Sequence, residues 1–224
     1  MTETPLSKNI TPIVWKILPT QQAVLVGQNG SGKSYLARAL LRNMPNVIVI
    51  DAKSEFEYVS LYGKPRIITN PHELSKIKTN DSSPIYYRPD PEFWDSETYD
   101  GVYKWIYTRR NCTVYTDELF AVMGETGKTP HWLNAILTRG RSLKIRSIAA
   151  TQRPFRIPLT TLSEAKHYFC FKLTLLDDIK RMQEVMNDDS KTLLTQRWKH
   201  DYQFWYYDST NSNNVMKPYI YKKG

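Results

Sequence analysis

The segment VLVGQNGSGKSYLARAL, residues 24–40, joins a short apolar run to a glycine cluster and then to a helical pattern. Within it Gly27, Gly32, Lys33 and Ser34 match the spacing G-x-x-x-x-G-K-[ST]. Glycines let backbone N–H groups turn toward phosphates at a helix amino end, where the lysine reaches the β and γ phosphates and the serine completes a Mg²⁺ shell. We therefore expect a strand, a loop and a helix that bind ATP together with Mg²⁺. The residues expected to contact the nucleotide are Gly27, Gln28, Asn29, Gly30, Ser31, Gly32, Lys33, Ser34 and Tyr35.

The rest of the chain alternates short apolar runs with segments of helical periodicity. Strands are expected at residues 23–26, 46–51, 66–69, 83–89, 112–117, 145–153 and 166–173. Helices are expected at residues 34–44, 93–109, 131–142 and 176–186, and a terminal hairpin at residues 201–208 and 217–223. Buried strands that alternate with helices indicate an α/β fold, with a mostly parallel central sheet flanked by helices and a C-terminal β-hairpin.

Length and composition favour one globular unit. The chain has 224 residues, of which 41% are hydrophobic and 24% are charged. We expect a single domain over residues 1–224, with residues 1–12 as a flexible amino-terminal arm. No apolar run approaches the ~18 residues that a membrane span needs, so a cytosolic location is expected.

The charge balance is strongly basic. Lys and Arg number 31 against 22 Asp and Glu, which gives a formal net charge of +9. Such an excess favours a polyanionic partner such as nucleic acid, although it is also compatible with plain solubility. The two cysteines and four histidines show no metal-ligand spacing, so no zinc site is expected.

Two acidic residues and one glutamine follow predicted strands. Asp117 and Glu118 end the strand CTVYT, where a carboxylate is suited to hold Mg²⁺ through water and the next one to act as general base. A pair of acids that simply caps the strand is the alternative. Gln152 ends the next strand, from where its amide is suited to sense the γ phosphate; a surface glutamine has the same sequence appearance.

A second Gly-Lys pair followed by a hydroxyl residue, Gly-Lys-Thr, occurs in GETGKT, residues 124–129. The pattern of the first loop would require glycine at position 122, where Val122 stands, and no strand leads directly into the segment. We therefore do not expect a phosphate cradle here. A solvated loop and a surface loop whose Lys128 contacts a nucleic-acid phosphate both remain open.

The segment LTRGRSLKIRS contains four basic residues in eight positions: Arg139, Arg141, Lys144 and Arg146. Such a cluster is suited to supply an arginine finger to a neighbouring subunit's nucleotide, where it stabilises transition-state charge. Arg139 and Arg141 are the candidates for that role. A solvated basic turn and a DNA contact are the alternatives.

Taken together, these segments resemble the FtsK/HerA superfamily of ring-forming, DNA-pumping ATPases over residues 20–185. The resemblance rests on the order of VGQNGSGKS, VIVIDAKSEF, VYTDEL, LTRGRSLKIRSIAATQRP and LSEAKHYFCFKL. The short chain and its terminal YQFWYYD and KPYIYKK segments look like the genome-packaging ATPases of viruses with internal membranes, of the tectivirus and turreted archaeal virus type.

This resemblance implies a RecA-like P-loop NTPase fold and a homo-oligomeric ring, pentameric or hexameric, with nucleotide at the subunit interfaces. It implies that ATP hydrolysis drives double-stranded DNA through the central pore. It carries over Lys33 and Ser34 as the phosphate and Mg²⁺ residues, Asp117 and Glu118 as the Walker B pair, and Gln152 as the sensor. It also implies a location in the host cytoplasm or at a virion vertex, docked on a portal or vertex protein.

Two further functions compete with genome packaging. A DNA-transfer or DNA-processing motor of a plasmid or mobile element would use the same chemistry in another setting. A regulatory GTP switch is less favoured, because the chain lacks an Asn-Lys-x-Asp motif for guanine. Tyr115 and Thr116 depart from the family pattern, since a Walker B strand is usually wholly apolar before its acid.

Overall fold

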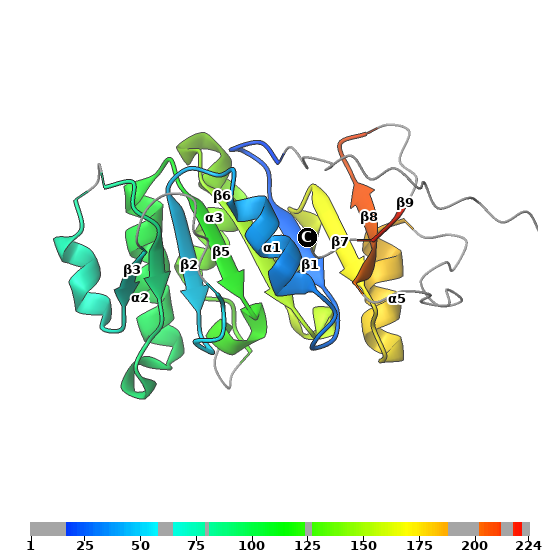
Figure 1. Ribbon diagram of the computed structural model, residues 1–224, viewed down its shortest axis with the longest axis horizontal. Helices are drawn as coiled ribbons and strands as arrows, with labels where there is room; N and C mark the ends of the chain where they lie inside the picture. The colour runs from blue at the N-terminus through cyan, green and yellow to red at the C-terminus, as the bar shows by residue number, and fades with distance from the viewer. Residues whose placement is uncertain are drawn as a thin grey trace, which may run out of the picture.

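The computed structural model describes residues 17–57, 65–78, 81–123, 127–187, 202–211 and 217–220, the last four by their backbone only. The predicted arm at residues 1–12 lies outside these ranges. Nine strands form one sheet in the order β3-β4-β2-β5-β6-β1-β7-β8-β9 (Figure 1). The strands are β1 Ala23–Val26, β2 Val47–Asp51, β3 Arg66–Ile68, β4 Ile85–Tyr87, β5 Thr113–Asp117, β6 Arg146–Thr151, β7 His167–Phe171, β8 Gln203–Asp208 and β9 Lys217–Ile220.

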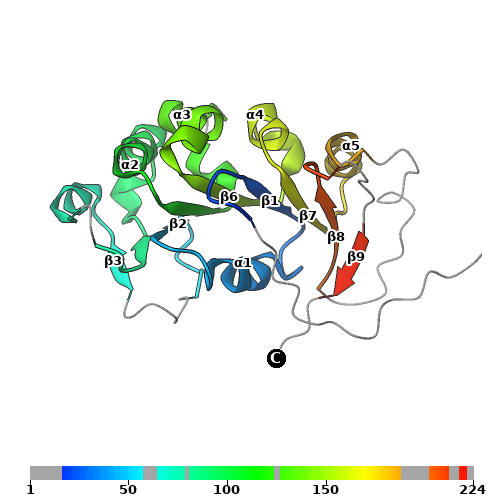
Figure 2. The same ribbon diagram turned by 90° about the horizontal axis from the view of Figure 1, so that it is seen from above.

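Helices cover both faces of this sheet. The α-helices are α1 Lys33–Leu41, α2 Ser96–Arg109, α3 His131–Arg139, α4 Leu159–Ser163 and α5 Leu176–Val185. Short 3-10 turns are η1 Pro71–Lys76, η2 Pro91–Phe93, η3 Leu119–Met123, η4 Gly140–Leu143 and η5 Pro154–Arg156. Figure 2 shows α1 on one face and α2, α3, α4 and α5 on the other. Among the helices of the described ranges, none has the length and apolarity needed to cross a bilayer.

The pairing of the strands confirms the expected α/β fold. Strands β1 to β7 pair in parallel, whereas β8 is antiparallel to β7 and β9 is antiparallel to β8. The β8–β9 pair is the predicted C-terminal hairpin, with Gln203 opposite Ile220. Parallel neighbours need crossover connections, and here helices or turns supply them.

The core consists of two layers because successive strand residues point to opposite faces. In β1, Leu25 belongs to the layer under α1, together with Leu36 of the helix. Its neighbours Val24 and Val26 belong to the layer under α2 to α5. The apolar runs of the sequence are therefore buried on both sides, as is typical of parallel sheets.

Tyr115 and Thr116, the two residues of β5 that depart from the family pattern, have partners inside the protein. The Tyr103 and Thr116 hydroxyls lie 2.8 Å apart, and both side chains are buried. The Tyr115 hydroxyl donates a 2.7 Å hydrogen bond to Asp117 Oδ1. Buried hydroxyls that are paired in this way cost little, so the departure from an apolar strand does not disturb the sheet.

One expected helix begins later than its sequence pattern indicated. We expected it to start at residue 93, but Phe93 ends η2 and α2 begins at Ser96. Asp95 is the N-cap, because its carboxylate accepts a 2.8 Å hydrogen bond from the Thr98 N–H. The apolar residues before the cap therefore belong to a separate turn that starts at Pro91.

The parallel strands end along a single edge of the sheet. The order places β6 between β1, which leads into the glycine loop, and β5, which ends in the acidic residues. The carboxyl ends of β1, β2, β5 and β6 point the same way in Figure 1. Ligand sites of open α/β sheets lie outside this edge, so we expect the functional site there.

Candidate functional site

The glycine loop leaves β1 and is anchored to both neighbouring strands. The Gly27 N–H donates to the Thr151 carbonyl at 3.2 Å, and the Gln28 N–H donates to the Lys172 carbonyl at 2.9 Å. Gly27, Gly30 and Gly32 have φ angles of 155°, 71° and 102°, which other residues rarely adopt. The loop conformation therefore depends on these three glycines.

Close packing also excludes side chains at two of these positions. A Cβ atom at Gly27 would lie 2.5 Å from the Phe171 Cβ. One at Gly32 would lie 2.6 Å from Tyr202 Cδ1. Strands β7 and β8 thus approach the loop as closely as glycine allows, which explains the two motif glycines by packing as well as by backbone angle.

Lys33 folds back over the loop from the first position of α1. Its Nζ donates hydrogen bonds of 2.7 Å to the Gly27 carbonyl and 3.0 Å to the Gln28 carbonyl. Burial lowers the Lys33 pKa to about 8, while the negative charges of Glu118 and Asp117 act in the opposite direction. A buried ammonium group in a loop of backbone N–H donors is suited to bind an anion such as a polyphosphate.

Asp117 ends β5 beside other carboxylates. Burial raises its pKa, and the charges of Asp51 and Glu118 raise it further, whereas the Tyr115 hydrogen bond and Lys33 lower it. A cation next to Asp117 would relieve this crowding of negative charge. The oxygen donors of Asp117 and Ser34 fit Mg²⁺, which prefers carboxylate, hydroxyl and water ligands. When bound, Mg²⁺ would neutralise phosphate charge.

Glu118 turns away from the direction of β5 and reaches β6. Its φ angle is 61°, a left-handed conformation that costs energy for any residue other than glycine. Glu118 Oε1 accepts a 3.0 Å hydrogen bond from Thr151 Oγ1, and Oε2 accepts a 3.3 Å hydrogen bond from the Gln152 N–H. The carboxylate is held in one position by the end of β6.

Gln152 and Lys53 complete the surroundings of Glu118. Gln152 follows β6 and is half-buried, and its backbone N–H contacts the Glu118 carboxylate. Lys53 Nζ lies 3.9 Å from Glu118 Oε2. Sequence reasoning did not assign Lys53 to the nucleotide site. The signal that it belongs to this site is its place two residues after β2, the neighbour of β5 in the sheet.

The basic cluster at residues 139–146 lies at the opposite edge of the sheet. Arg139 ends α3 and Arg141 is in η4, and both side chains are exposed. The turn meets the amino ends of β5 and β6, where the Asn111 N–H donates to the Leu143 carbonyl at 3.0 Å. Neither arginine therefore takes part in the site of its own subunit.

Arg146 does not belong to the exposed cluster, contrary to the sequence expectation. Its side chain is buried, with Nη1 donating to Thr113 Oγ1 at 3.0 Å and Nε donating to the Leu18 carbonyl at 3.2 Å. The residue opens β6, and the inward direction of its side chain is fixed by strand alternation. Arg146 is a structural residue.

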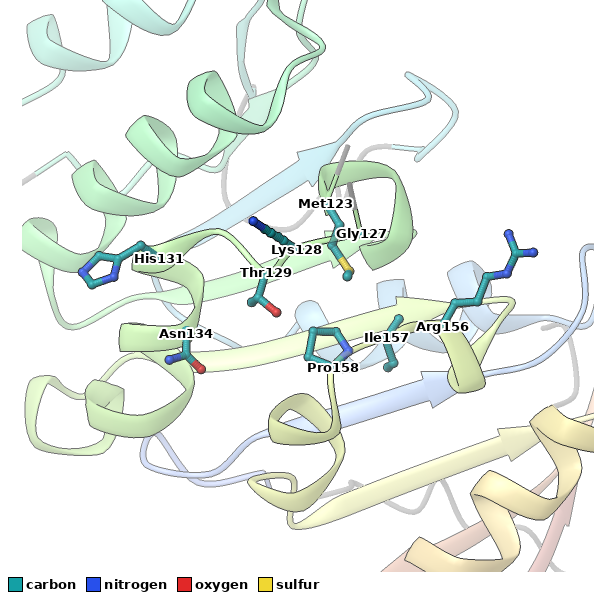
Figure 3. A pocket seen from close by; sticks show the side chains of 9 residues that line it. All are labelled: Met123, Gly127, Lys128, Thr129, His131, Asn134, Arg156, Ile157 and Pro158. Carbon is teal, nitrogen blue, oxygen red and sulfur yellow. The ribbon is translucent and has the colours of Figure 1, made fainter. Parts of the chain in front are cut away.

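A second hollow of about 620 Å³ lies on the face covered by α2 to α5. Figure 3 shows Lys128 and Thr129 between His131 and Arg156, which stand at its two ends. Met123, Gly127, Asn134, Ile157 and Pro158 complete the lining. Among the described residues that line it, none is acidic. Lys128 and Arg156 are exposed, so this surface is suited to an anionic ligand.

The strand order and the glycine loop together define a P-loop NTPase fold. In this fold β6 separates β1, which leads into the loop, from β5, which ends in the acidic residues. No protein-family model and no curated protein sequence matches the chain. Solved structures do match it.

The genome packaging NTPase B204 from Sulfolobus turreted icosahedral virus 2 is one of these structures. In complex with sulfate it has a TM-score of 0.68 and 18% identity, and the match covers 93% of this chain and 100% of that one. Its complex with AMPPCP has a TM-score of 0.65 and 18% identity, and the match covers 90% and 98%. VirB4 of Thermoanaerobacter pseudethanolicus has a TM-score of 0.66 and 11% identity, with 91% and 89% covered.

These similarities confirm the fold that the FtsK/HerA resemblance implied. This chain has the P-loop NTPase fold of B204 and VirB4 over nine-tenths of its length. The identities of 11% and 18% establish the fold, and the chemistry has to be argued from the residues of this chain.

Proposed function

We propose that this chain is an ATP-driven translocase of double-stranded DNA, and specifically a viral genome-packaging motor that works as a homo-oligomeric ring. The observation that carries the proposal is that Thr151, at the end of β6, joins the glycine loop to Glu118. Its carbonyl accepts a hydrogen bond from the Gly27 N–H at 3.2 Å, and its hydroxyl donates one to Glu118 Oε1 at 3.0 Å. A phosphate-binding ammonium group and two carboxylates around one space are what nucleotide hydrolysis requires.

In this proposal each residue has one task. Lys33 leaves the Gly27 and Gln28 carbonyls and binds the β and γ phosphates. Glu118 orients the attacking water and accepts its proton, since its carboxylate is fixed by the end of β6. Ser34 and Asp117 would hold Mg²⁺, which would supply charge neutralisation.

Gln152 connects hydrolysis to movement in this proposal. It lies between Glu118, which its N–H contacts, and the loop that continues through η5. If cleavage of the γ phosphate shifts Glu118, the hydrogen bond to the Gln152 N–H would therefore displace residues 152–158. Three of these, Arg156, Ile157 and Pro158, line the second hollow.

The second hollow is the DNA contact in this proposal. Its cationic side chains, Lys128 and Arg156, suit the phosphate backbone, which dominates sequence-independent binding. Arg153, in the same loop as Arg156, has another partner. Its Nε donates to Asp178 Oδ2 at 2.9 Å, and Asp178 is buried, so Arg153 ties this loop to α5.

The ring assembly is proposed from the position of Arg139 and Arg141. Exposed at the sheet edge opposite the loop, one of them would enter the nucleotide site of the next subunit, with five or six copies in the ring. A portal or vertex protein of the capsid would provide the docking surface, in the host cytoplasm or at the virion vertex.

A combined ATPase and assembly assay tests this function. We expect duplex DNA to stimulate ATP hydrolysis and ATP to promote a ring that light scattering detects. Glu118→Gln should retain ATP while turnover falls by about 10²- to 10⁴-fold, because the general base is lost. Hydrolysis indifferent to DNA, from a chain that stays monomeric with nucleotide, would contradict the proposal.

A DNA-transfer motor of a mobile element is the second candidate. Such a motor would use the same ATP hydrolysis and the same contacts to the DNA phosphate backbone. Both candidates share the ATPase result above. Neighbouring genes separate them, since a capsid gene supports packaging and a relaxase gene supports transfer.

A further inference from the structure

A tyrosine from the C-terminal part of the chain forms a wall of the loop pocket. Tyr202 directly precedes β8, yet it lines a hollow of about 300 Å³ together with the glycine loop. The other lining residues are Asn29, Gly30, Ser31, Gly32, Lys33, Ser34, Tyr35 and Arg38. The ring of Tyr202 packs on Gly32, where a Cβ atom would meet its Cδ1 at 2.6 Å.

Tyr202 differs from the aromatic residues that follow it. Phe204 is 1% exposed and fills the layer under α1, whereas Tyr202 is 41% exposed. Its φ angle of 62° is left-handed, so the backbone is strained where the ring is placed. A ring that only filled the core would not stand half in solvent beside the loop.

The lining of the hollow combines two kinds of chemistry. The loop has the backbone N–H groups and Lys33, which suit phosphate groups. Tyr35 and Tyr202 add aromatic rings, and Arg38 stacks on the Tyr35 ring at 5.3 Å. The face of a phenol ring has no donor for a phosphate, but it stacks well on a nucleobase.

We propose that Tyr202 is the platform for the base of the bound nucleoside triphosphate, so that the C-terminal segment sets base affinity. This inference rests on the nucleotide binding proposed above and adds the residue that recognises the base. Stacking tolerates any base and increases with ring area. The pocket therefore takes purine nucleotides more tightly than pyrimidine nucleotides.

Binding of ATP and of inorganic tripolyphosphate, each with Mg²⁺ and measured by calorimetry, separates the base from the phosphates. Tyr202→Ala should weaken ATP binding by roughly five- to hundredfold and leave tripolyphosphate binding within about twofold. Tyr202→Phe should keep wild-type ATP affinity, because the ring face remains. Trp94→Ala, which truncates an exposed aromatic side chain just after η2, is the matched control and should change neither ligand.

Each other result overturns the inference in a distinguishable way. Unchanged ATP affinity in Tyr202→Ala shows that the ring does not contact the base. An equal loss for ATP and tripolyphosphate shows that Tyr202 supports the loop instead. If the wild-type chain binds ATP no more tightly than tripolyphosphate, the base adds no affinity and this inference alone fails. If it binds neither ligand, the proposed function fails with it.

Discussion

The chain contains two loops in which Gly-Lys is followed by Ser or Thr, and the surroundings of the two loops differ. In the first, Lys33 is buried and donates hydrogen bonds to two loop carbonyls, and the loop leads from a strand directly into α1. In the second, Lys128 is exposed and follows a 3-10 turn, and a Cβ at Gly127 would have no atom within 4 Å.

This difference shows that a phosphate cradle depends on its surroundings. Strands β6 and β7 hold the first loop by hydrogen bonds to Gly27 and Gln28, and the packing on Gly27 and Gly32 leaves no room for side chains. The second loop lies on an open basic surface beside Arg156. The first loop is suited to bind a buried phosphate group in one orientation. The second loop is suited to contact a DNA backbone that moves along the surface.

The largest expected effect separates the two lysines. Lys33→Ala should lower kcat/KM for ATP by about 10³-fold or more, because the ammonium group that stabilises transferred charge is lost. Lys128→Ala should bind ATP with wild-type affinity, since its side chain lies in the second hollow. Calorimetry and a phosphate-release assay measure both. Similar losses in the two variants would break the distinction between the loops.

A pH series tests the burial of Lys33. Its pKa is lowered from the ordinary value of 10.5 to about 8, so between these values the unfolded chain binds more protons than the folded one. The cost of the buried charge is complete below pH 8 and disappears as the pH rises toward 10.5. The free energy of unfolding of the nucleotide-free wild type should therefore rise relative to Lys33→Met, by on the order of 2–3 kcal/mol.

Denaturant unfolding at pH 7, 8, 9 and 10 measures this difference. Lys128→Met is the control for loss of an exposed ammonium group. A constant gap between wild type and Lys33→Met over this range would show that Lys33 is not desolvated in the folded state.

The smallest expected effect concerns the second loop. Replacing Lys128 and Arg156 together with Ala should weaken duplex DNA binding by about tenfold and reduce the slope of log K against log salt by about 1.8. The paired control is Arg42→Ala with Lys76→Ala, which removes one exposed Arg and one exposed Lys elsewhere. Fluorescence anisotropy at four salt concentrations measures it. If both double variants have the same slope of log K against log salt, the effect is one of net charge, and Lys128 and Arg156 do not form a specific DNA contact.

The sequence by itself determined what depends on neighbouring residues. The loop of residues 27–34, the strand before it and the helix after it follow from contiguous residues, and so do the acidic pair and the order of strands and helices. Periodicity and turn chemistry act over a few residues, so such features can be read locally. The start of α2 shows the limit, because the Asp95 cap outweighed an apolar pattern.

Only the tertiary structure decided which distant residues meet. The strand order brings Lys53 and Gln152 to Glu118, and it places Tyr202 on Gly32. It also buried Arg146, whereas Arg139, Arg141 and Lys144 of the same basic cluster are exposed. These contacts join residues far apart in the chain, and no local pattern encodes them. They arise when the sheet is assembled and each strand end is fixed beside its neighbours.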